Sequence, residues 1–149
     1  MSNIILRQLV SAEIENLHVF FADWFSGRAP SSDEYFHENL ERRLARDFVI
    51  IPPGGSLLGG AEISAMIRAA HGSNPEFRIA IRNIVIRRQT GRYVLATYEE
   101  WQRHARNSNP PDNARLATVM LETGEGYIWH HLHETWLPRE IMEAGPYDF

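Results

Sequence analysis

The sequence contains neither cysteine nor lysine, so all fifteen basic residues among the 149 are arginine. Without cysteine, disulfides, thiolate nucleophiles and cysteine-based zinc sites are excluded. Without lysine, Schiff-base catalysis is excluded, because it needs a side-chain amine. No apolar run approaches the ~20 residues that span a bilayer, and the first ten residues lack the pattern of a signal peptide. We therefore expect a cytoplasmic protein that makes no membrane contact.

Several sequence motifs of nucleotide-binding proteins and serine hydrolases are also missing. The G-x-G-x-x-G, P-loop and G-x-S-x-G motifs do not occur. The formal net charge is −4, which gives no general attraction for nucleic acid, and the arginines at 82, 87, 88 and 92 read as a solvated strand end. Apolar residues make up 44% of the chain, enough for a core of common domain size. We expect residues 1–149 to form one domain that uses no cofactor and binds no nucleic acid.

The hydrophobic pattern changes period along the chain. Helical spacing predicts one helix over residues 11–26, with Trp24 on its aromatic face, and another over residues 61–72. A short buried strand is expected between them, at residues 47–52. After Pro75, alternation predicts two strands around a turn at 89–91 and two more before residue 138. Apolar parity switches near Asn83, which predicts a bulge in a bent sheet. Helices followed by hairpin strands indicate an α+β fold.

The order of these elements resembles the nuclear transport factor 2-like superfamily. The resemblance rests on "WFSG", "RDFVIIPPGGSLLGGAEISAMI" and "ARLATVMLETGEGYIWHHLHETWLP". In the SnoaL-like and kinase association-domain branches, the last hairpin often has the form Arg-x-Thr, turn, Gly-Trp-x-Ile-x-His-x-His-x-Ser. Here His131 and His133 match directly, whereas Tyr127, Trp129 and Thr135 replace the Trp, Ile and Ser.

The resemblance implies a single SnoaL-like domain with a cone-shaped, strongly curved antiparallel sheet wrapped over N-terminal helices, a cystatin-like roll. It also implies an internal pocket and a homodimer. Isomerases, dehydratases, cyclases and non-catalytic subunits all occur in this superfamily, so the fold leaves the activity open.

The histidine-rich last strand divides between two faces if side chains alternate strictly. One face would carry Trp129, His131, His133 and Thr135, and the other His130, Leu132, Glu134 and Trp136. His131 and His133 lie two residue rises apart, ~6.6–6.8 Å. Such a pair suits a transition metal only with a third ligand, such as Glu99 or His71, and we predict no metal site. The histidines instead cap the hairpin, line an interface, or act as acid–base catalysts in the pocket.

The remaining candidate site residues are aromatic or cationic. Trp24 is at the end of the first helix, Trp101 and Arg103 share one face of a strand, and Arg115 lies near the family arginine. These four are the predicted ligand-binding residues, with Phe21, Phe48 and Met66 as apolar walls. His131 and His133 are the predicted catalytic residues.

Three functions follow from these candidates. The first is binding of a small hydrophobic, anionic or carbonyl-bearing molecule, because arginine and histidine suit an oxygen-rich group. The second is a cofactor-independent isomerase, dehydratase or cyclase that uses a pocket histidine. The third is a dimerisation or association module without chemistry.

Overall fold

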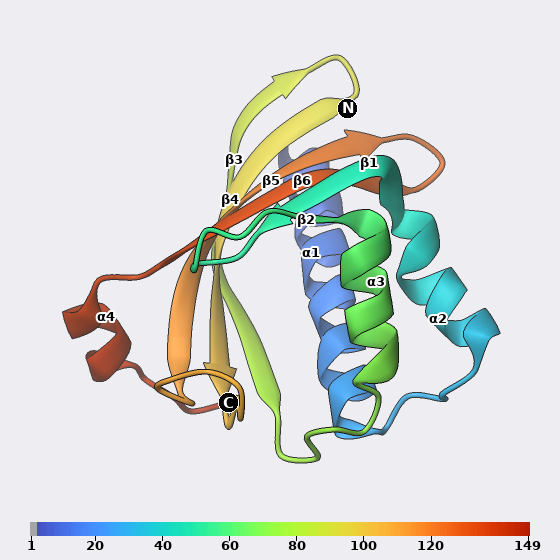
Figure 1. The fold of residues 1–149 in the computed structure, drawn as a ribbon. Helices are drawn as coiled ribbons and strands as arrows, with labels where there is room; N and C mark the ends of the chain where they lie inside the picture. The colour runs from blue at the N-terminus through green and yellow to red at the C-terminus, as the bar shows by residue number, and fades with distance from the viewer. Residues whose placement is uncertain (1–2) are drawn as a thin grey trace.

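A computed structural model describes residues 3–149 as an α+β fold in which the helices before residue 70 lie against one side of a curved, six-stranded sheet (Figure 1). The helices are α1 (Asn3–Ser26), α2 (Asp33–Asn39), the short 3-10 turn η1 (Glu41–Arg43), α3 (Gly60–Ala69) and α4 (Arg139–Ala144). The first helix begins well before Ser11, where the sequence predicted its start. Its buried stripe runs back through Ile14 and Val10 to Leu6, so the helical spacing extends toward the N-terminus.

The strands are β1 (Leu44–Ile51), β2 (Leu58–Gly59), β3 (Arg78–Thr90), β4 (Tyr93–Arg103), β5 (Asn113–Thr123) and β6 (Tyr127–Trp136). Their order across the sheet is β2-β1-β6-β5-β4-β3. All neighbouring pairs are antiparallel except β1 and β6, which run parallel. The predicted α+β fold with a strongly curved sheet over N-terminal helices is confirmed, with this one parallel pairing added.

Two of the register irregularities in the sheet bear on the sequence predictions. In β3 the register shifts between Arg82 and Val85, and Asn83 has a positive φ of 56°. This is the predicted bulge, at the predicted residue. In β6, Met120 faces His131 while Leu121 faces Trp129, so His130 is an extra residue without a partner across the ladder. This second bulge reverses which face the following residues occupy.

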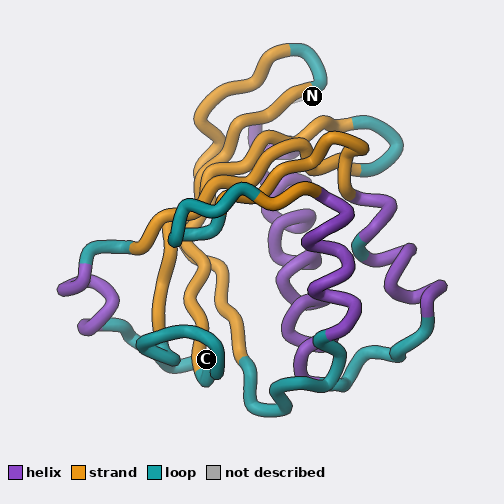
Figure 2. The backbone as a smooth tube through the Cα atoms, in the orientation of Figure 1, coloured by secondary structure: helices purple, strands orange, loops and turns teal. Residues whose placement is uncertain are grey.

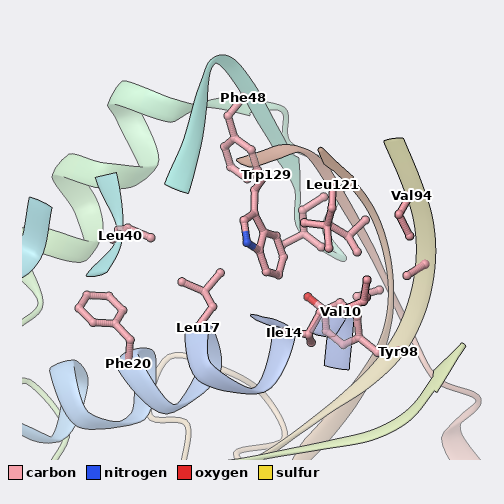
Figure 3. Close-up of a cluster of buried hydrophobic side chains, with 14 of the residues drawn as sticks. Val10, Ile14, Leu17, Phe20, Leu40, Phe48, Val94, Tyr98, Leu121 and Trp129 are labelled. Atoms are coloured by element: carbon pink, nitrogen blue, oxygen red, sulfur yellow. The ribbon is translucent and has the colours of Figure 1, made fainter. Parts of the chain in front are cut away.

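The main core lies between the helices and the inner face of the sheet. Val10, Ile14, Tyr98, Leu121 and Trp129 are fully buried within it (Figure 3). A smaller apolar cluster on the other face contains Trp101, Ala114 and Leu137. The helix α4 and the C-terminal residues lie on that outer side, away from α1 and α3 (Figures 1 and 2).

Across the described residues 3–149, no helix combines the length and the apolar character needed to cross a membrane.

Candidate functional site

A cavity of about 240 Å³ lies between the helices and the inner face of the sheet. This volume is enough for several water molecules or a small ligand. Most of its wall is aliphatic or aromatic, and five polar side chains interrupt it. The apolar lining includes Phe21, Phe25, Phe48, Ile67, Phe77, Trp129 and Leu132. The polar lining is His18, Glu100, Gln102, Arg115 and Glu134.

The five polar residues form one connected chain across four elements. His18 Nε2 of α1 lies 3.0 Å from Glu100 Oε1 of β4, and the other Glu100 oxygen accepts from Gln102 Nε2. Arg115 Nη2 of β5 donates to Gln102 Oε1 at 3.4 Å, and Nη1 donates to Glu134 Oε1 of β6 at 3.5 Å. Inner-facing positions of three adjacent strands bring the last four together, because side chains two residues apart share a face.

The first pair in this chain is a buried ion pair. His18 Nδ1 lies 2.7 Å from the Ile14 carbonyl, so both ring nitrogens face acceptors and both carry hydrogen. Burial opposes a charged imidazole, yet the Glu100 carboxylate outweighs it and raises the pKa of His18. Burial likewise favours neutral Glu100, but His18 and Arg115 lower the pKa of Glu100 to about 2. Both shifts favour the ionised form of the pair.

Glu134 is different, although it also contacts an arginine. Burial and the charge of nearby Glu100 raise the pKa of Glu134 to about 7, against the opposing effect of Arg115. Arg115 is only 11% exposed at its side chain, and its contacts to Glu134, Gln102 and Asn113 are all long, at 3.3–3.5 Å. The cavity thus holds a guanidinium with long hydrogen bonds beside a carboxyl group whose pKa is raised toward neutrality.

His131 and His133 lie on the outer face of β6, where both are exposed. Strict alternation predicted that they share a face with Trp129, and this prediction is wrong because the extra residue His130 shifts the parity between them. The β6 residues that line the cavity are Trp129, Leu132 and Glu134. His71, a proposed third metal ligand, instead lies within hydrogen-bond distance of Ala29 O. Residues 3–149 contain no cluster of three His, Asp or Glu side chains suited to a metal ion.

The four predicted ligand-binding residues occupy three different places. Arg115 lines the cavity. Trp24 is a fully buried core residue whose Nε1 donates to Ile67 O at 2.7 Å. Trp101 and Arg103 face outward, where the C-terminal residues cover them. Of the predicted walls, Phe21 and Phe48 line the cavity, whereas Met66 is 58% exposed.

The sequence reasoning missed four of the five polar cavity residues. It favoured the face of β4 that carries Trp101 and Arg103, whereas Glu100 and Gln102 lie on the opposite face of that strand. The signal for His18 was its position between Ile14, Leu17 and Phe21 on the apolar stripe of α1. An imidazole on that stripe needs buried acceptors, which is a reason to look for a carboxylate across the core.

Few curated proteins resemble this chain in sequence. No family model matches the chain. Sucrose-phosphatase 2 of Nicotiana tabacum is 23% identical over 132 residues, which are 84% of this chain. The chain spans only 30% of the length of that relative.

Solved structures match over most of the chain. A nuclear transport factor 2-like protein of unknown function from Pseudomonas aeruginosa is 26% identical, with a TM-score of 0.75 over 87% of this chain and 99% of that one. An uncharacterised cystatin-like protein from Caulobacter vibrioides is 16% identical, with a TM-score of 0.63 over 93% and 94%. The CaMKII hub of S. rosetta is 10% identical, with a TM-score of 0.66 over 87% and 95%. By its fold and these likenesses, the chain belongs to the nuclear transport factor 2-like superfamily.

Proposed function

We propose that the protein binds a small, mostly apolar molecule in the inner cavity and holds its carboxylate or carbonyl end at Arg115. One observation carries this proposal: a nearly buried guanidinium lines an apolar cavity, and its hydrogen bonds to neighbouring side chains are all long, although it also lies over the Trp136 ring. A ligand oxygen that accepts two short N–H bonds from Arg115 would improve on those contacts. The aromatic walls formed by Phe21, Phe48 and Trp129 suit the apolar remainder of such a ligand.

Charge balance within the cavity supports the same ligand class. His18 and Glu100 neutralise each other, which leaves Arg115 opposite Glu134. When Glu134 is protonated, the site carries one net positive charge and is complementary to a monoanion. Carboxylate binding therefore takes up a proton at Glu134 whenever that residue is ionised beforehand.

The experiment is a thermal-shift and calorimetric titration with hexanoate, octanoate and phenylpropanoate, and with octanol as the uncharged counterpart. We expect at least one carboxylate to stabilise the protein, and Arg115→Gln to weaken its binding at least ~10-fold. Arg139→Gln is the matched control, since Arg139 pairs with Glu143 on the surface. His131→Ala and His133→Ala should retain wild-type affinity, because both residues face outward. Equal binding by the Arg115 and Arg139 variants would refute the proposal.

Proton-transfer catalysis in the same cavity is the second candidate function. Its supporting observation is the raised pKa of Glu134, about 7, which suits a general acid–base at neutral pH. In an isomerase, dehydratase or cyclase, Glu134 would move the proton and Arg115 would stabilise the developing oxyanion. His131 and His133, the catalytic residues predicted from the sequence, would need to reach a substrate from the outer face.

Self-association is the third candidate, and the likeness to a hub domain supports it. A homodimer that uses the outer face of the sheet would cover His131 and His133. Sedimentation velocity of the wild type and of the His131→Ala/His133→Ala variant tests this arrangement. The proposal requires a dimer that the double substitution weakens.

A further inference from the structure

The last five residues, 145–149, lie across the outer face of β3 and β4. Tyr147 and Phe149 pack with Trp101 and Ala80 in the outer apolar cluster, and Trp101 is only 3% exposed beneath them. The Trp101 and Tyr147 rings meet edge to face with centroids 5.4 Å apart. The tail thus covers an aromatic surface that would otherwise face solvent.

Two arginines of the sheet bind the same segment through its main-chain oxygens and its aspartate side chain. Arg82 Nη2 donates to Pro146 O at 2.7 Å and to Asp148 Oδ1 at 3.0 Å, while Arg103 donates to a main-chain oxygen of Phe149. The Arg82 guanidinium also lies over the rings of Trp101 and Phe149, at 4.5 and 5.6 Å from their centroids. Together these groups recognise an aromatic–acidic–aromatic sequence.

The tail is attached to this surface rather than built into the sheet. Within residues 3–149, no strand pairs with residues 145–149. Asp148 is exposed at 71% of its side chain, so water reaches its ion pair with Arg82. A hollow of about 670 Å³, lined by Pro110, Trp136 and Met142 among others, separates α4 from the neighbouring loop. Loose packing of this kind lowers the free energy needed to open the segment locally.

We propose that Ala80, Arg82, Trp101 and Arg103 form a peptide-binding site, which the chain's own tail fills and which the tail of a second copy enters by exchange. Each copy carries both the basic aromatic site and the complementary acidic aromatic segment. Exchange keeps every contact of the closed form, so it links two copies at little cost beyond association itself. Other proteins with an exposed aromatic–acidic–aromatic segment would compete for the site.

The first test uses the full chain with a weakened tail, Tyr147→Ala/Phe149→Ala, and a fluorescein-labelled peptide of residues 138–149. Fluorescence anisotropy should show that this variant binds the peptide at least ~10-fold more tightly than the wild type, whose own tail competes at high effective concentration. Adding Arg82→Gln should abolish most of the binding. Adding Arg88→Gln should not, since Arg88 donates to the Arg87 main chain on the same strand.

A second test keeps both aromatic residues of the tail, Tyr147 and Phe149, and uses the absence of cysteine in the chain. Asp148→Cys and Asp112→Cys proteins are mixed and treated with a short bismaleimide, since Asp112 and Tyr147 line the same hollow. Exchange predicts a cross-linked pair, whereas Asp148→Cys with Asp33→Cys, which lies at the start of α2, should give little. The proposal is overturned if the folded tail variant binds no peptide, if Arg82 and Arg88 substitutions act equally, or if both cysteine pairs cross-link alike.

Discussion

Glu134 is a buried carboxyl group, and its effect on stability has a definite sign. Its folded pKa, about 7, is above the ordinary value of 4.5, so between those pH values the folded state holds more protons than the unfolded one. The free energy of unfolding therefore falls as pH rises from ~4.5 to ~7. His18, whose pKa is also raised, adds to this loss of stability above pH ~6.5. Glu100 has a lowered pKa, so its contribution to stability is lost only as pH falls from ~4.5 toward ~2.

We expect Glu134→Gln to remove much of this pH dependence. The wild type should lose on the order of 3 kcal/mol between pH 4.5 and 7.5 through this group, or roughly 6–12 °C in Tm. The variant should show a flatter profile and become the more stable protein at pH 8. Thermal unfolding across this range, followed by circular dichroism, measures both. Parallel profiles for the two proteins would contradict the assignment.

The ion pair of His18 and Glu100 predicts strong non-additivity. His18→Leu should cost about 3–5 kcal/mol, because it leaves a buried carboxylate without its main counter-charge. The double variant His18→Leu/Glu100→Gln should be destabilised by less than the sum of the single changes, with a coupling above ~1 kcal/mol. Urea unfolding of all four proteins gives the cycle, and additive costs would argue against a charged pair.

Among the elements, the junction between α1 and α3 depends on two glycines. Gly27 and Gly72 both have positive φ, and both main-chain N–H groups donate to Trp24 O. A Cβ at Gly27 would lie 3.2 Å from Gly72 Cα. Close approach and backbone conformation thus both require glycine where the two helices end.

Gly27→Ala should therefore destabilise the protein by about 1–3 kcal/mol. The control is Gly54→Ala, since a Cβ there meets no atom within 4 Å. Differential scanning calorimetry should show a clear decrease in Tm for Gly27→Ala and almost no change in Tm for Gly54→Ala. Similar Tm values for both variants would show that the junction tolerates a side chain.

The sequence predicts where the strands lie better than it predicts which face of the sheet each side chain occupies. Alternation located β3 to β6, and the parity switch at Asn83 located its bulge, because apolar residues lie on both sides of it. The bulge at His130 left no such trace, since histidines and tryptophans occupy both faces of β6. Trp101 and Arg103 do share one face of β4, as predicted, but alternation alone does not say which face meets the helices, and Glu100 and Gln102 occupy the face that does. Their partner His18 lies 82 residues from Glu100, beyond any local pattern.

At the scale of the whole molecule, the two faces of the sheet have separate chemistry. The inner face, covered by α1 and α3, holds the buried polar chain and the cavity. The outer face holds the tail, the arginines that bind it, and the exposed histidines. Neighbouring residues of β4 serve both, because Glu100 and Gln102 point inward while Trp101 and Arg103 point outward. The proposed tail exchange and the proposed ligand binding therefore involve alternate residues of one strand.

The position of β1 beside β6 constrains how the protein is made. β1 ends at Ile51, but its neighbour β6, with which it forms the parallel pair, begins only at Tyr127. At ~5–20 residues per second, a ribosome needs several seconds to deliver that partner. We expect ribosome-released chains ending at Glu125 to be digested rapidly by protease, and full-length chains to resist. In that interval the apolar face of α1 and the edge of β1 stay open to aggregation, so yield in the cell depends on how well nascent chains are shielded.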